Sequence, residues 1–143
     1  MIIVSSCLAG IKCRYDGHHN LVPEIRELVL SGKAIPLCPE ELGGLPTPRI
    51  PCEIVKVENQ LKVMTKEQTD YSKHFLMGAQ KVADIARTLD CKLAILKANS
   101  PSCEYGTVYD GRFTEKKIKG NGLTAEQLLK QGVEIKNESN FKL

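Results

Sequence analysis

The run IIVSSC (residues 2–7) is a short apolar segment of strand length that ends at a cysteine. The same arrangement recurs in AIPLC (residues 34–38), and again in LAILKA (residues 93–98), which Cys103 follows after a brief polar turn. If these segments are neighbouring parallel strands, their three thiols meet at the carboxyl edge of one sheet, where such sheets bind ligands. They then form a candidate ligand set for a metal centre that keeps one coordination position open.

The segments between these strands carry helical patterns, which together predict an α/β fold. Residues 23–32 predict a helix that begins at a proline and ends at a glycine, and residues 69–89 predict a longer, capped helix. TAEQ (residues 124–127) has the form of a capping box that opens a last helix, and residues 133–135 predict a final short strand. Strands that alternate with helices indicate a mainly parallel central sheet with helices on both faces, a Rossmann-like arrangement.

Two further segments depart from this alternation. Alternating apolar residues flank a polar turn near residues 53–64, which predicts a β-hairpin excursion from the sheet. Residues 36–48 hold four prolines and two glycines, so we expect a loop without regular structure there. The 143 residues suffice for one hydrophobic core, and we expect a single domain over residues 1–143.

Composition argues against several classes of protein. The net charge of +3 is too mild for the basic stripe of a nucleic-acid-binding protein, and without tryptophan no stacking platform for bases is obvious. No apolar run approaches the roughly 18 residues of a membrane helix, and residues 1–5 lack the flanks of a signal peptide. We therefore expect a cytoplasmic protein with no membrane partner, in which the six cysteines stay reduced.

The spacing of the thiols bears on the kind of metal they could hold. Structural zinc sites usually draw cysteines in close pairs, about two to four residues apart, and no two cysteines of this chain have that spacing. Dispersed thiolates that a fold brings together can hold an iron–sulfur cluster instead, and the spacing slightly favours this. Cys52 and Cys91 fit small apolar packing residues, whereas Cys13 lies in a loop that could fold back over the site.

Side chains close to the strand-end cysteines are candidates for substrate chemistry. Glu40 and Glu41 follow Cys38 directly, and a partly desolvated carboxylate there could move protons, although Glu41 fits a solvated loop charge better. Ser100 and Ser102 could orient a substrate or satisfy backbone groups of the turn. Three further loop residues could contact a ligand or pair with one another: Arg14, Asp16 and Arg49.

Three sequence motifs surround the strand-end cysteines. They are SSCLAG with CRYDG (residues 5–10 and 13–17), PLCPE with LGGLPTPR (residues 36–40 and 42–49), and KANSPSC with YDG (residues 97–103 and 109–111). In this order they resemble the thiouracil desulfidase family, long catalogued only as a domain of unknown function. The matches extend from residue 5 to about residue 122, nearly the whole chain.

The resemblance implies a [4Fe–4S] cluster held by Cys7, Cys38 and Cys103, with the fourth iron free of protein ligands. In the family this iron is understood to bind the sulfur of a small thiolated pyrimidine and to act as a Lewis acid, without net redox change. The resemblance also maps the family's carboxylate onto Glu40 and the serine of its third motif onto Ser100. Our hypothesis is that Glu40, helped by Ser100, delivers a water and shuttles its proton.

One position departs from the family pattern. The residue after the third cysteine is usually glycine in the family, and here it is Glu104, which adds bulk and charge beside the expected pocket.

Two other functions fit the same residues. A sulfur carrier would hold the cluster, or a persulfide on Cys7 or Cys103, without turnover of its own. A regulatory protein would use the thiols for a stabilising zinc ion. Sulfide release from 2-thiouracil or 4-thiouridine separates the enzyme from the carrier, and metal analysis identifies zinc.

Overall fold

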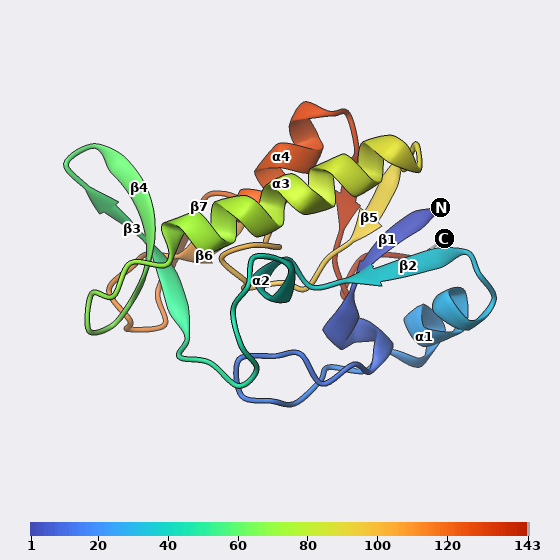
Figure 1. The fold of residues 1–143 in the computed structure, drawn as a ribbon, viewed down its shortest axis with the longest axis horizontal. Coiled ribbons are helices and arrows are strands. Elements are labelled where there is room, and N and C mark those ends of the chain that lie inside the picture. The colour runs from blue at the N-terminus through green and yellow to red at the C-terminus, as the bar shows by residue number, and fades with distance from the viewer. Residues whose placement is uncertain (143) are drawn as a thin grey trace.

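A four-stranded parallel sheet forms the centre of the computed structural model, which describes residues 1–142 (Figure 1). Its strands are β1 (Ile2–Ser5), β2 (Ala34–Leu37), β5 (Leu93–Ile95) and β8 (Glu134–Lys136). Their spatial order is β2-β1-β5-β8, and Ile3 of β1 pairs in register with Ile35 on one side and Ala94 on the other. The mainly parallel sheet predicted from the sequence is confirmed.

Helices cover both faces of this sheet, which also confirms the prediction. They are α1 (Pro23–Leu30) on one face, α3 (Ser72–Thr88) and α4 (Leu123–Lys130) on the other. Ile3 packs with Val82 of α3 and Leu128 of α4, whereas the next residue, Val4, packs with Ile25 of α1. Successive side chains of a strand point to opposite faces, so a strand covered on both sides must be apolar throughout.

The strand order creates a switch point between β1 and β5. From β1 the chain crosses through α1 to β2 on one side, and later returns through α3 to β5 on the other side of β1. Loops that leave the carboxyl ends of β1 and β5 therefore diverge, and ligands of open α/β sheets bind in the crevice that this divergence opens.

Two hairpins lie beyond the carboxyl edge of the sheet (Figure 1). The first, β3 (Cys52–Val57) with β4 (Gln60–Thr65), is the hairpin predicted from the sequence. The second, β6 (Thr107–Tyr109) with β7 (Lys117–Lys119), has strands too short to produce a readable alternation in the sequence. Gly111 lies against the carbonyl of Ile54, so the second hairpin packs on the first with no side chain between them.

The structure corrects two local predictions. The proline-rich segment contains a short helix, α2 (Pro39–Leu42), because proline is compatible with the first helical position. Thr124 does not cap α4, which begins one residue earlier, at Leu123. Instead the carbonyls of Pro101 and Ser102 accept the N–H groups at the start of α4, at 2.8–3.1 Å. The first turn of α4 is thus bonded directly to the segment that carries Cys103.

Helix α2 contacts α3 directly through backbone atoms, with no side chain between the two helices. A Cβ atom on Gly78 of α3 would lie 1.9 Å from the carbonyl oxygen of Pro39, and one on Gly43 would lie 2.0 Å from that of His74. Both distances are shorter than any real contact, so only glycine fits at either position. This contact fixes the height of α2 above the sheet edge.

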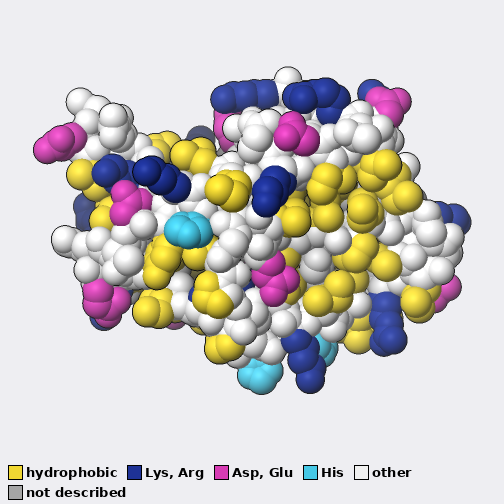
Figure 2. All heavy atoms as spheres, in the orientation of Figure 1, with side chains coloured by type: hydrophobic (Ala, Val, Ile, Leu, Met, Phe, Trp, Pro, Cys, Tyr) yellow, Lys and Arg dark blue, Asp and Glu magenta, His cyan; other side chains and the backbone are white. Residues whose placement is uncertain are grey.

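Charged side chains of both signs are scattered over the face drawn in Figure 2, which also exposes many apolar side chains. This face therefore lacks a basic stripe. Among residues 1–142, no helix has the length and apolar character needed to cross a bilayer.

Candidate functional site

A cleft of about 770 Å³ opens between the carboxyl edge of the sheet and the two hairpins. Its walls come from parts of the chain that are distant in sequence, namely the ends of β1, β2 and β5, the loop after the first cysteine, and residues of β3 and β6. Its volume lies within the range of small-molecule sites. The cleft at the carboxyl ends of β1 and β5 is therefore large enough to hold a small ligand.

Cys7, Cys38 and Cys103 all line this cleft, and each follows a different strand. Cys7 lies in the 3-10 turn η1 (Ser6–Ala9) directly after β1, and Cys38 lies between β2 and α2. Cys103 ends the turn that follows β5. The three side chains are 4–9% exposed, so they line the floor of the cleft rather than its rim.

The loop after η1 brings a fourth thiol, Cys13, into the same place. The N–H of Asn20 donates to the carbonyl of Cys7 at 2.9 Å and folds the loop back over the site. Cys13 lines the cleft beside the other thiols, and its backbone carbonyl lies 3.9 Å from the thiol of Cys38. Sulfur atoms of Cys13 and Cys38 and a carboxylate oxygen of Glu41 lie within 4.8 Å of one another. Four thiols thus gather where the strand pattern indicated three.

The buried thiols differ in how readily they ionise. A hydrogen bond from Cys13 lowers the pKa of Cys7, although burial acts in the opposite direction. Hydrogen bonds to Cys38 and Cys7, together with burial, raise the pKa of Cys13. Burial raises the pKa of Cys103 well above its ordinary value. Any metal bound by these thiols must therefore displace protons as it binds.

Glu40 and Ser100 meet across the cleft. The Ser100 hydroxyl donates to Glu40 Oε1 at 3.3 Å, and the Cys38 thiol lies 3.6 Å from Glu40 Oε2. Ser100 Oγ also accepts the backbone N–H groups of Ser102 and Cys103, at 3.1 and 3.2 Å. Because these amides occupy its lone pairs, the hydroxyl proton is directed to Glu40. Glu40 is only 8% exposed, so its carboxylate faces the thiols from a largely dry position.

Arg49 ties two loops of the site together. Its Nη2 donates to the carbonyl of Cys13 at 3.0 Å, and its backbone N–H donates to the carbonyl of Tyr15 at 2.7 Å. The guanidinium thereby links the loop that carries Cys13 to the proline-rich segment after α2. Arg49 also lines the cleft.

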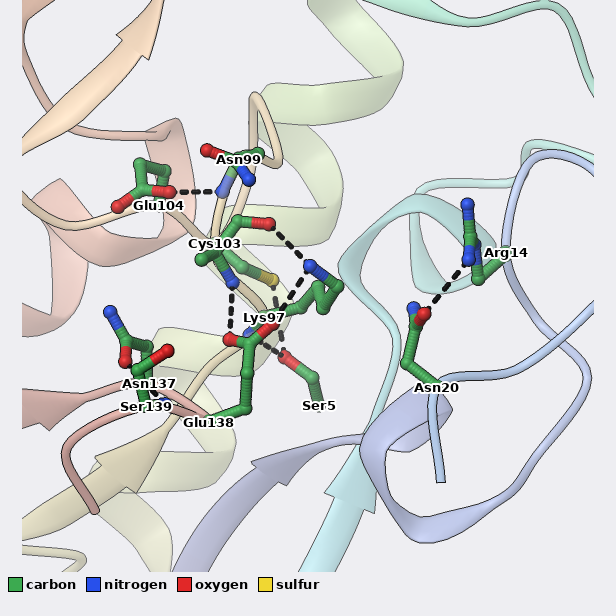
Figure 3. Close-up of polar contacts among 11 residues, drawn as sticks. Ser5, Arg14, Asn20, Lys97, Asn99, Cys103, Glu104, Asn137, Glu138 and Ser139 are labelled. Carbon is green, nitrogen blue, oxygen red and sulfur yellow. Dashed lines mark hydrogen bonds and ion pairs between the residues drawn. The ribbon is translucent and has the colours of Figure 1, made fainter. Parts of the chain in front are cut away.

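The other loop candidates differ in their access to the cleft. Arg14 lines it, donates to Asn20 Oδ1 at 2.8 Å (Figure 3), and forms an ion pair with Asp16 at 3.2 Å. Asp16 thus pairs with its neighbour, one of the two outcomes expected from the sequence. Ser102 is fully buried, and within residues 1–142 its hydroxyl has no hydrogen-bond partner. Glu104 is also buried, and its carboxylate accepts the N–H of Asn99 rather than extending into the cleft.

The profile of the 2-thiouracil desulfurase family matches residues 2–140 of the chain. The chain belongs to this family. It is 42% identical to an uncharacterised protein, YbbK of Bacillus subtilis (strain 168), over 99% of this chain and 97% of that protein. It also resembles the solved structure of a [4Fe-4S]-dependent thiouracil desulfidase, TudS, with a TM-score of 0.89 and 36% identity over 98% of this chain and 91% of that one. The family indicated by the motifs is confirmed, and its enzymes cleave a carbon–sulfur bond.

Within this desulfurase fold, three residues of the site were assigned no role from the sequence, although two of them lie in the quoted motifs: Ser5, Lys97 and Glu138. Ser5 Oγ donates to Cys103 Sγ at 3.5 Å and accepts the N–H of Lys97 at 2.9 Å, and Lys97 Nζ forms a 2.8 Å ion pair with Glu138. Each residue looks like an ordinary strand-end or tail residue, and only the strand order brings them together.

The two remaining cysteines of this family member lie apart from the four gathered thiols. Cys91 packs in the core between the sheet and its helices, as the sequence indicated. Cys52 begins β3 at the wall of the cleft, where burial raises its pKa to about 11.

Proposed function

We propose that this protein hydrolytically removes sulfur from a thiolated pyrimidine, with a [4Fe–4S] cluster held by Cys7, Cys38 and Cys103. The observation that carries the proposal is the presence, in one cleft, of these strand-end thiols and the hydrogen-bonded pair of Glu40 and Ser100. Membership of the desulfurase family and the likeness to a [4Fe-4S]-dependent thiouracil desulfidase support it.

The donor set of the site suits such a cluster. Thiolates are the ligands that iron–sulfur clusters take, and three of them approach from three strands at the floor of an open cleft. When bound, the cluster would supply an iron without a protein ligand, a Lewis acid for a thiocarbonyl sulfur. In this proposal Cys13 is a neighbour of the ligands, and its backbone carbonyl lies 3.9 Å from the thiol of Cys38.

Glu40 serves as the base in this proposal, and Ser100 orients it. The hydroxyl of Ser100 holds Glu40 Oε1, which leaves the carboxylate aimed into the cleft beside Cys38. The carboxylate takes a proton from a water as the water oxygen bonds to the ring carbon, and it returns that proton to the departing sulfur. The carbon–sulfur bond then breaks, and the new hydroxyl on the ring carbon loses the second proton of the water to solvent. The products are a pyrimidine carbonyl, hydrosulfide and that proton, so the reaction needs neither oxidant nor reductant.

Two arginines complete the proposed substrate site. Arg14 and Arg49 line the cleft, and their guanidinium groups are donors suited to the carbonyl oxygens and ring nitrogens of a pyrimidine. Asp16 holds Arg14 in place through their ion pair.

The proposal is tested by anaerobic reconstitution with iron and sulfide, followed by absorption spectroscopy, metal analysis and a sulfide-release assay with 2-thiouracil. We expect cluster absorption and repeated turnover in the wild type, and loss of both in Cys38→Ala. Cys91→Ser is the matched control, because Cys91 is equally buried but lies in the core.

Three outcomes would contradict the proposal. A wild-type protein that takes up no cluster removes its basis. A protein that holds the cluster but turns over less than once per chain is a carrier rather than an enzyme. Stoichiometric zinc with no visible charge-transfer absorption identifies a zinc-stabilised protein.

A further inference from the structure

Side-chain oxygens hold the first backbone amides of the segment 97–103, the segment that carries Ser100 and Cys103 (Figure 3). Three consecutive N–H groups donate to three different side chains. The pairs are Lys97 to Ser5 at 2.9 Å, Ala98 to Glu138 at 2.8 Å, and Asn99 to Glu104. Two of the three acceptors are carboxylates, which form stronger hydrogen bonds than neutral oxygens do.

The two carboxylates reach the segment from different directions. In Figure 3, Glu104 approaches from the left and Glu138 from below. Glu138 belongs to the tail after β8, yet it lies against the segment after β5 because these two strands are neighbours in the sheet. Glu104 follows the segment directly, and the chain turns back so that its carboxylate meets the N–H of Asn99.

Both carboxylates are placed where an unpaired charge would be costly. Glu104 is 3% exposed, and burial of a carboxylate without hydrogen bonds is strongly unfavourable. Glu138 is partly buried and also pairs with Lys97 Nζ at 2.8 Å. Burial by itself would raise the pKa of Glu138, but the hydrogen bonds from Lys97 and Ala98 outweigh it and lower the pKa. Glu138 is therefore an ionised acceptor at neutral pH.

The backbone held in this way has an uncommon conformation. Asn99 has a φ of 67°, in the left-handed region that non-glycine residues seldom adopt. Directly after it, Ser100 accepts two amides of its own turn and donates to Glu40. A free loop with this geometry would sample other conformations, in which the Ser100 hydroxyl no longer reaches Glu40.

We propose that Glu104 and Glu138 are positioning residues that fix the segment 97–103 and so place Ser100 and Cys103 at the cleft. The inference rests on the proposed function, since the residues positioned are those assigned to orient the base and to bind the cluster. The acceptor oxygen performs this role, so glutamine, which keeps an oxygen at the same place, should largely preserve it and alanine should not.

Amide hydrogen exchange measured by NMR on the reduced, metal-free protein tests the positioning directly, without any need for activity. In Glu104→Ala we expect the amide of Asn99 to exchange about tenfold faster or more, and in Glu138→Ala we expect the same for Ala98. The variants Glu104→Gln and Glu138→Gln should stay within about threefold of the wild type. Glu134→Ala is the matched control, because it removes an exposed glutamate of β8.

Steady-state kinetics of the reconstituted protein supply the second readout. We expect the alanine variants to lose kcat for sulfide release by about tenfold or more with KM changed little, and the glutamine variants to recover most of it. The inference is overturned if the amides of Asn99 and Ala98 exchange at wild-type rates in both alanine variants. It is also overturned if these amides exchange faster in the alanine variants while kcat stays unchanged. A wild type that never turns over would instead defeat the proposed function, while the exchange comparison would still decide whether the carboxylates hold the segment.

Discussion

The backbone contact between α2 and α3 makes Gly78→Ala the most informative single change in the scaffold of the site. The added methyl would lie 1.9 Å from the carbonyl oxygen of Pro39, whereas the shortest ordinary contact is 3.4 Å, so the two helices would have to separate by about 1.5 Å. Forced expansion of a packed contact costs about 3 kcal/mol, and the better helix propensity of alanine returns about 1 kcal/mol. We expect a net loss of about 2 kcal/mol, or about 5–8 °C in Tm.

The same displacement should reach the chemistry, because α2 carries Glu40 and begins next to Cys38. A misplacement of about 1 Å can cost about a hundredfold in rate, so we expect kcat per cluster to fall by about that factor. Thermal unfolding of the metal-free protein, followed by circular dichroism, measures the stability loss. Cluster absorption and sulfide release from 2-thiouracil, measured anaerobically after reconstitution, give the effect on the site.

Gln80→Ala is the control for helix propensity, because Gln80 is an exposed residue of the same helix. It should change stability by no more than about 0.5 kcal/mol and leave turnover intact. A Gly78→Ala protein with the wild-type Tm and the wild-type rate of turnover would refute this prediction. The position of α2 would then not depend on the backbone contact between Gly78 and Pro39.

Three further outcomes are expected. Glu40→Gln should keep its cluster but release sulfide about 10²–10⁴-fold more slowly. The control Glu41→Gln alters an exposed carboxylate and should release sulfide at close to the wild-type rate. Equal losses of rate in the two variants would contradict the assignment of Glu40 as the base. Cys13→Ser should retain cluster absorption per chain, and a loss as large as that of Cys38→Ala would place Cys13 among the ligands. Because the folded-state pKa of Glu138 lies below the ordinary value of 4.5, its contribution to stability is present above that pH and is lost as the pH falls through the folded-state pKa. The Tm difference between the wild type and Glu138→Gln, measured without metal, should therefore narrow on acidification, and a constant difference would contradict this.

The strand-end cysteines could be predicted because two simple rules combine in them. An apolar run of strand length is a local signal, and parallel strands necessarily present their carboxyl ends at one edge. Cys7, Cys38 and Cys103 are therefore placed at that edge from the sequence, and the family motifs name the same residues. Glu40 and Ser100 follow because they lie within three residues of a thiol.

Other parts of the site depend on contacts that no local pattern encodes. The position of Cys13 follows from the path of its loop, which the bonds from Asn20 and Arg49 determine. Thr124 looks like a helix cap, but the neighbouring turn supplies carbonyls to that helix and leaves the threonine buried. In the sequence Glu138 is an ordinary acidic residue near the end of the chain, and only the pairing of β8 with β5 brings it to the segment 97–103. These are properties of the assembled sheet rather than of any segment.

The order of strands in the sheet also governs when the site can come into existence. Cys7 and Cys38 belong to β1 and β2, which pair early in the chain, whereas the third strand-end thiol arrives only when β5 inserts along the free edge of β1. Such long-range pairing is late because it must first close a long loop. A nascent chain that lacks β5 has only Cys7 and Cys38 of the proposed ligands, beside the unpaired edge of β1. Pairing of β5 with β1 then brings both Cys103 and Ser100, the hydrogen-bond partner of Glu40, to the site. If these residues hold the cluster as proposed, its complete ligand set exists only after β5 has paired with β1, so the cluster would assemble on the folded sheet rather than on an emerging polypeptide.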